Sequence, residues 1–249
     1  MANWSDPRLS GSSPAAPTAG SADLALDAGL RAHMVSVYNY MTSGILLTGI
    51  VALLFAESGA VMSLFNMNTG GPSLLGYLVM FAPLGIVLWM SFGINRISTA
   101  TAQVLFWAFA VIMGVSLSTI FLIYTNASIA LTFFATAAAF ASLSLYGYTT
   151  KRDLSGLGTF FLMGLVGLIV ASVVNLFWMN DTFSLLIAAV GVLIFAGLTA
   201  YDTQKIKSMY FAVAGSDFAG KAVVMSALTL YLDFINMFLF LLRFLGSRD

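Results

Sequence analysis

The sequence contains no cysteine, a single histidine and few charged residues. The lack of cysteine excludes disulfides and thiolate metal sites, but it does not indicate in which cellular compartment the protein is located. His33 precedes the first long apolar segment, which removes most catalytic arrangements that need an imidazole inside a membrane. Charged residues make up 8% of the 249 residues and the formal net charge is zero, so no nucleic-acid-binding surface is predicted.

Apolar residues are abundant, at 60% of the chain. Soluble domains are about 45–50% apolar and about 25% charged, so the solvent of this chain is predicted to be lipid. Seven segments have the length of about 20 residues that a helical span needs. We place them at 34–56, 73–94, 104–124, 128–148, 157–178, 183–203 and 223–245. Because backbone groups in lipid must be satisfied within each segment, the predicted fold is an all-α membrane protein with seven transmembrane helices.

Residues 1–29 differ from the rest in composition, because they are rich in Ser, Ala, Pro and Gly. Such a stretch cannot bury enough apolar surface to fold and is predicted to be a disordered N-terminal tail. Residues 30–249 then form one transmembrane domain. A disordered tail would also suit recognition of a partner protein.

Lysine and arginine are distributed unevenly among the predicted loops. The loops after the first, third and fifth spans contain none. The N-terminal flank and the other loops contain Arg31, Arg96, Lys151, Arg152, Lys205, Lys207 and Lys221. The positive-inside rule therefore predicts a cytoplasmic N-terminus and, with seven crossings, an external C-terminus. Arg243, in the last turn of the seventh segment, is an exception to this pattern. It would also be compatible with a last segment that enters the membrane and returns to the cytoplasmic side.

Two acidic residues fall within the last two spans. Asp202 lies near the end of the sixth span and Asp233 lies well inside the seventh. An aspartate at the centre of a membrane helix costs roughly 2.5–3.5 kcal/mol on insertion scales, so each is a candidate functional residue. The alternative is a structural hydrogen bond or ion pair that sets helix packing, and Asp202 is also close enough to the interface to reach it.

Polar residues on the seventh span share one face with Asp233. At 100° per residue, Ser226, Thr229, Asp233, Asn236 and Arg243 fall within an arc of about 100°. Such a stripe belongs in the interior of a helix bundle or along a wet cavity, where Ser226, Thr229 and Asn236 would form a polar pathway. The alternative is that these side chains hold helices together, as they do in many bundles.

The two aspartates meet only if the sixth helix continues past Asp202, and the following stretch YDTQKIKSMYF has no Gly or Pro to stop it. Two carboxylates in one apolar pocket cannot both ionise without a large cost, so they should titrate jointly. Carboxylate oxygens are also the ligands that Ca²⁺ prefers. A proton and Ca²⁺ are therefore expected to compete at Asp202 and Asp233. Arg96 is a candidate counter-charge, or else a membrane anchor.

Three stretches resemble the transmembrane Bax inhibitor motif family, in its bacterial branch. They are SLYGYTTKRDLSGLG, FAGLTAYDTQKIKSMY and ALTLYLDFINMFLFLLRFLG, and the likeness extends over about residues 30–246. The resemblance implies a central last helix flanked by two groups of three helices. It also implies a pH-sensitive calcium leak in the bacterial inner membrane, with the aspartate pair at the positions of Asp202 and Asp233. An arginine described as a latch to that pair matches Arg96, by its distance from Gly114.

Three classes of function follow. The first is a proton-gated Ca²⁺ leak, in which Ca²⁺ is the transported ion and no cofactor is required. The second is a non-conducting regulator of other membrane proteins; the resemblance links bacterial members to a membrane-embedded AAA protease and eukaryotic members to suppression of cell death. The third, an intramembrane enzyme, is disfavoured because the His-Glu-x-x-His and Gly-x-Ser-x-Gly motifs are absent. An aspartyl protease, which needs two aspartates, stays formally open.

Overall fold

The structure is a computed structural model that describes residues 19–67, 70–178 and 180–247. Seven α-helices make up most of this part of the chain, and all seven are long and apolar enough to cross a membrane. They are α1 (Ala19–Glu57), α2 (Leu74–Gly93), α3 (Thr99–Leu117), α4 (Asn126–Thr149), α5 (Ser155–Trp178), α6 (Asp181–Val213) and α7 (Ala219–Leu245). Two short 3-10 helices, η2 (Ala60–Leu64) and η3 (Ser118–Leu122), follow α1 and α3. The predicted seven-helix fold is confirmed.

Short polar residues fix the start of four helices. The hydroxyl of Ser73 accepts a hydrogen bond from the backbone N–H of Gly76 at 3.1 Å, and Ser98 and Thr125 cap α3 and α4 in the same way. The carboxamide oxygen of Asn180 accepts from the N–H of Phe183 at 2.9 Å. Each cap satisfies a backbone donor that the first helical turn leaves without a partner, which matters most where little water is present.

The helix boundaries differ from the predicted ones chiefly at α1. Helix α1 begins at Ala19, so residues 19–29, which we expected to belong to a disordered tail, are helical; residues 1–18 lie outside the described residues. The physical reason is local, because the stretch SADLALDA is rich in alanine and leucine, which favour helix. Helix α6 continues past Asp202 to Val213, as its sequence predicted.

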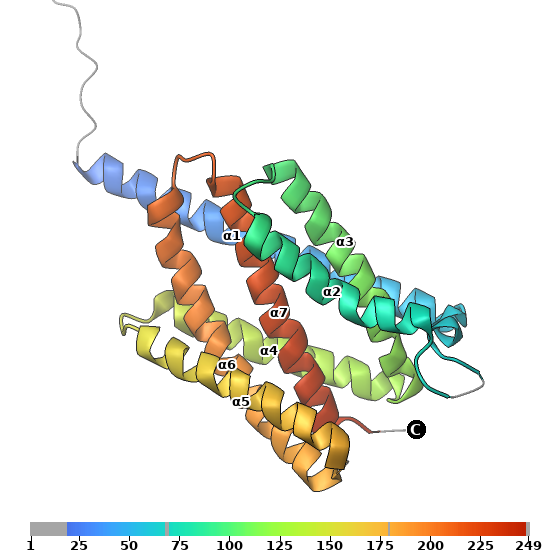
Figure 1. Cartoon of the computed structure of the whole chain (residues 1–249). Helices are drawn as coiled ribbons and strands as arrows, with labels where there is room; N and C mark the ends of the chain where they lie inside the picture. Colours follow the sequence, from blue (N-terminus) through green and yellow to red (C-terminus); the bar gives the residue numbers. More distant parts are fainter. Residues whose placement is uncertain (1–18, 68–69, 179, 248–249) are drawn as a thin grey trace, which may run out of the picture.

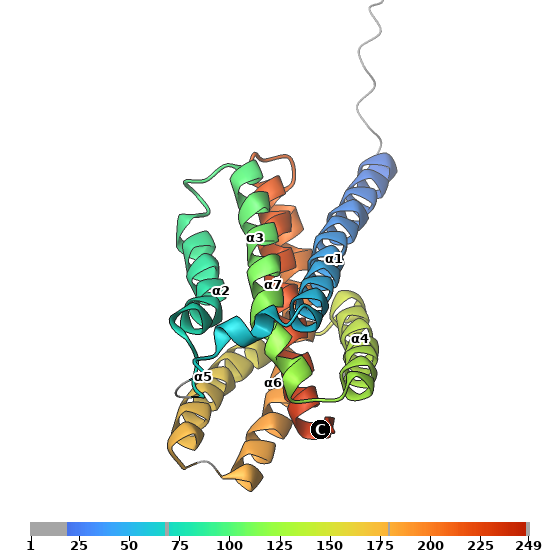
Figure 2. The same ribbon diagram turned by 90° about the vertical axis from the view of Figure 1, so that its right-hand side faces the viewer.

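Helix α7 occupies the centre of the bundle (Figure 1). It packs against α6, α1, α4 and α3. The other six helices form two groups, since α3 packs on both α1 and α2, and α6 packs on both α4 and α5 (Figure 2). This confirms the expectation of a central last helix between two groups of three. Large apolar side chains such as Phe92 and Phe177 cover the outer surface, as a lipid-facing protein requires.

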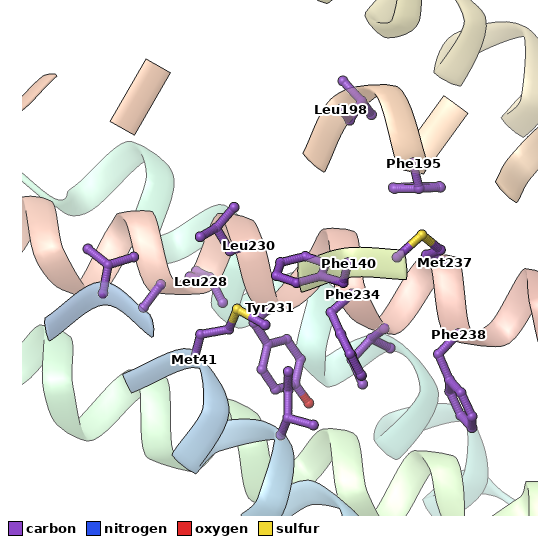
Figure 3. Packing of buried hydrophobic residues seen from close by; sticks show 14 of the residues in the cluster. Met41, Phe140, Phe195, Leu198, Leu228, Leu230, Tyr231, Phe234, Met237 and Phe238 are labelled. Carbon is purple, nitrogen blue, oxygen red and sulfur yellow. The ribbon is translucent and has the colours of Figure 1, made fainter. Parts of the chain in front are cut away.

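Aromatic side chains fill the space around α7. The ring of Phe234 contacts Phe133 and Phe140 of α4 edge to face, with centroids 5.6 and 5.5 Å apart. Tyr231, one turn earlier on α7, contacts Phe109 of α3, with centroids 5.0 Å apart. Figure 3 shows Phe140, Tyr231 and Phe234 within this cluster. Edge-to-face pairs of this kind add about 0.5–1.5 kcal/mol each beyond the area that they bury.

A buried polar contact joins α1, α3 and α7 inside this apolar core. The Thr48 hydroxyl donates to the carbonyl oxygen of Ala110 at 2.8 Å. The hydroxyls of Thr48 and Tyr231 are 2.7 Å apart. Since the single proton of Thr48 is already directed to Ala110, Tyr231 is the donor in the second bond. The chain of bonds fixes the rotation of α7 relative to α1.

We expect Tyr231→Phe to lower the free energy of unfolding by about 1–2 kcal/mol, because it removes one buried hydrogen bond and leaves Thr48 without its donor. The free energy is measured by titrating a denaturing detergent into the solubilised protein. Tyr146→Phe is the control, because Tyr146 is 48% exposed on the outer surface. An equal loss in both variants would contradict the structural role of the Tyr231 hydroxyl.

Candidate functional site

Asp202 of α6 and Asp233 of α7 come together in the interior of the bundle. The two side chains line the same cavity, and their carboxyl groups are close enough to influence each other's charge. The two residues are buried, with exposed fractions of 9% and 4%. The continuation of α6 beyond Asp202 makes the meeting possible, because it carries this side chain alongside the middle of α7.

Two neighbouring carboxylates in an apolar interior repel each other, so the pair is expected to titrate jointly and to share a proton. One oxygen of the pair, Oδ2 of Asp233, is buried and has no hydrogen-bond partner among the described residues. Lys205, which follows one turn after Asp202, is the positive charge that acts on this pair. The pair is therefore a candidate proton site, with Oδ2 of Asp233 available as an acceptor.

The aspartate pair lies on the wall of a cavity of about 500 Å³ between α5, α6 and α7. Thr229 and Asn236 of α7 line the same cavity, as the helical spacing predicted. The Asn236 amide donates to the carbonyl of Leu232 at 2.8 Å, and the Thr229 hydroxyl donates to that of Met225 at 3.1 Å. Each side chain acts as a donor in these bonds, so its oxygen remains free to accept a hydrogen bond or to coordinate a cation.

A second cavity, of about 450 Å³, adjoins the first. Ser172 of α5 lines both of them. The second cavity is polar and lies toward the α5–α6 connection. Its lining residues include Asn175, Asp181, Ser184 and Arg243. Arg243 belongs to the predicted stripe on α7, so the stripe continues from the aspartate pair toward the end of the bundle where α7 finishes.

Two residues of the predicted site lie elsewhere. Ser226 is buried and its hydroxyl has no partner among the described residues, but it does not line the cavity of the aspartate pair. Arg96 is exposed in the turn after α2 and forms no ion pair with either aspartate within the described ranges. The reason is that α2 packs on α3 and η2, on the outside of the bundle. The structure does not bring Arg96 to the pair, and a latch role for it stays a prediction.

The part of α6 that extends beyond Asp202 is tied by hydrogen bonds to the loop between α4 and α5. The Gln204 side chain accepts from the N–H of Leu154 and donates to the carbonyl of Arg152, both at 2.8 Å. Lys207 donates to the carbonyl of Tyr148, also at 2.8 Å. We call Gln204 and Lys207, with these three backbone partners, the loop clamp. Sequence reasoning did not predict the loop clamp, although its residues occur in two of the stretches that carry the family resemblance.

The oxygens at the pair suit a passing cation better than a resident one. Ca²⁺ takes six to eight oxygen ligands in protein sites. The described part of the chain has no group of three or more acidic or histidine side chains that could hold a metal ion. Asp202 and Asp233, with the oxygens of Thr229 and Asn236, supply only part of such a shell, and water would complete it. A cation bound here would remain partly hydrated and weakly held.

Sequence comparison identifies the family of this chain. A family profile described as "Inhibitor of apoptosis-promoting Bax1" matches residues 30–249. The chain belongs to the Bax inhibitor family. Its relatives include the inner membrane protein YbhL of Escherichia coli (strain K12), which is 45% identical over 223 residues, covering 89% of this chain and 94% of YbhL.

Two further relatives come from distant bacteria. The protein RP147 of Rickettsia prowazekii is 50% identical over 232 residues, covering 93% of this chain and 96% of RP147. A protein of Borreliella burgdorferi is 40% identical over 217 residues, covering 86% and 91% of the two chains. This Bax inhibitor family member is thus a multi-pass membrane protein, and the likeness covers nearly the whole length of each relative.

Proposed function

We propose that the chain is a proton-sensitive Ca²⁺ leak of the bacterial inner membrane, with its N-terminus in the cytoplasm and the Asp202–Asp233 pair as its gating centre. The observation that carries the proposal is that these two buried carboxyl groups, one from α6 and one from α7, line the wall of the same cavity. Oxygen ligands for a hard cation and a shared proton occupy the same place, so each competes with the other.

The charge of the pair links protonation to packing. With the shared proton present, the pair holds one negative charge at most. When the proton leaves, two adjacent negative charges repel each other unless a cation enters between them. Helices α6 and α7, which carry the charges, form the largest helix contact in the described structure. Protonation therefore acts on the interface that holds the central helix in place.

The test is Ca²⁺ flux into liposomes that contain the purified chain, measured across pH 5–8. We expect Asp202→Asn and Asp233→Asn each to lose the pH response. Flux at a given pH should change by about ten-fold, since removing one member of a coupled pair is worth about 1.4 kcal/mol or more. Asp217→Asn is the matched control, because Asp217 is exposed between α6 and α7.

Flux and pH response like those of the wild type in both Asn variants would defeat the proposal. A wild-type chain that is folded in the liposome but carries no Ca²⁺ at any pH would also defeat it. That second outcome would favour the other class of function, a non-conducting regulator of other membrane proteins.

A further inference from the structure

A groove between α1 and α4 is separate from the aspartate site. Both helices pack on α7 but have little contact with each other (Figure 2). The space between them is a cavity of about 680 Å³ whose floor includes Phe234 of α7. We call it the α1–α4 groove.

The body of the groove is apolar and long. Met41 and Ile45 line it from α1, and Ala137 and Ala141 line it from α4. The two alanines are one turn apart, so α4 presents a shallow hollow there. Along α1 the lining runs from Arg31 to Leu46, which is about 22 Å of helix at 1.5 Å per residue. This length exceeds one leaflet of a hydrocarbon core about 30 Å thick.

One end of the groove is polar. Tyr38 and Ser144 line it, and both contact the hydroxyl of Thr203 of α6, at 3.4 and 3.5 Å. One helical turn after Thr203, the Lys207 ammonium donates to the carbonyl of Tyr148 and lies 4.9 Å from the centre of the Tyr148 ring. Tyr148 itself lines the groove, so Lys207 stands at this end.

Arg31 brings a second positive charge to the same end, where it lines the groove from α1. Neither Arg31 nor Lys207 forms an ion pair within the part of the chain that the structure describes. Asp27, four residues before Arg31 on α1, is the nearest acid along that helix and makes no ion pair with it. The groove thus combines an apolar body with two unneutralised cations at one end.

We propose that the α1–α4 groove binds one phospholipid with an anionic headgroup. An acyl chain would lie along Met41, Ile45 and the alanines of α4, and the phosphate would lie at the end marked by Arg31 and by Lys207, which contacts the lining residue Tyr148. A free phosphate would meet only the cations and leave the apolar body unfilled. The charged end is the end that the positive-inside rule places in the cytoplasm, so the lipid comes from the cytoplasmic leaflet, where basic residues attract anionic headgroups.

The experiment is native mass spectrometry of the purified chain with dioleoyl phosphatidylglycerol and dioleoyl phosphatidylcholine added in equal amounts. We expect the anionic lipid to be bound preferentially. The double variant Arg31→Ala/Lys207→Ala should lose at least about five-fold of that preference, since each basic residue near an anionic headgroup is worth about 1 kcal/mol. The control is Arg96→Ala/Lys221→Ala, which removes two cations that neither line the groove nor contact a residue of its lining.

A second variant tests the apolar body without changing charge. Ala141→Trp fills the groove and should reduce retention of the anionic lipid, whereas Ala138→Trp, on the exposed face of α4, should not. An unchanged lipid preference in the double variant, or unchanged retention in Ala141→Trp, would overturn the proposal. So would displacement of the lipid by inorganic phosphate, or a spectrum dominated by lipid-free dimers, which would assign the groove to a second copy of the chain.

Discussion

Ser172→Phe is expected to reduce Ca²⁺ flux by about ten-fold or more, corresponding to a barrier raised by at least about 1.4 kcal/mol. Ser172 lines both the cavity of the aspartate pair and the polar cavity beside it. A phenyl ring at this position replaces a hydroxyl with an apolar wall where the two cavities adjoin, and a partly hydrated cation loses its oxygen contacts there. The change leaves Asp202 and Asp233 in place. A loss of flux would therefore show that Ca²⁺ passes Ser172, and it would not test the gating role of the aspartates.

Ser142→Phe is a closely matched control for this experiment. Ser142 of α4 is exposed, as Ser172 is, and each hydroxyl donates to the carbonyl four residues earlier at 2.8 Å. Only Ser172 faces the cavities, so only its replacement should reduce liposome flux. If both variants conduct like the wild type, the route through α5, α6 and α7 is wrong even where the aspartate variants behave as expected.

Gly147→Ala should lower the free energy of unfolding by about 2 kcal/mol, within the range of about 1–3 kcal/mol that overpacking usually costs. Gly147 is buried where α4 crosses α6. A methyl group at this position would overlap the backbone carbonyl oxygen of Ala200. A backbone atom in a helix cannot move aside as the end of a side chain can, so α4 must shift away from α6.

Gly167→Ala provides the comparison for Gly147→Ala, because a methyl group at Gly167 of α5 meets nothing within 4 Å. That change should leave stability the same or raise it by up to about 1 kcal/mol, the usual advantage of alanine over glycine in a helix. Denaturing-detergent titration of both variants measures the difference. A loss of equal size in both would show that the α4–α6 crossing is not tightly packed.

The fold was predictable because a segment that crosses a bilayer must be about 20 residues long, largely apolar and hydrogen-bonded within itself. Seven apolar stretches of the right length became seven helices, and the polar face of Asp233 and Asn236 predicted which side of α7 meets a cavity. The start of α1 was missed because the composition of residues 1–29 is ambiguous, with helix formers in its second half. An amino-acid composition averaged over residues 1–29 does not show at which residue the helix-forming part begins.

The surroundings of the aspartate pair were harder to predict than the pair itself. Ser172 and Thr48 are hydroxyl side chains within largely apolar spans, where such side chains often bond only to their own helix. Their roles depend on which neighbour each faces, and the sequence does not contain the rotation of one helix relative to another. Arg96 shows the opposite problem, because a charge near the right depth lies outside the bundle once α2 packs on α3.

The loop clamp limits how the bundle can rearrange. Gln204 lies two residues after Asp202, and with Lys207 it holds the backbone of Tyr148, Arg152 and Leu154. A displacement of α6 at the aspartate pair must therefore pull the α4–α5 connection with it. Helices α4, α5 and α6 are therefore expected to move together, and any rearrangement at the aspartate pair would take place where this group packs against α7 and the first three helices.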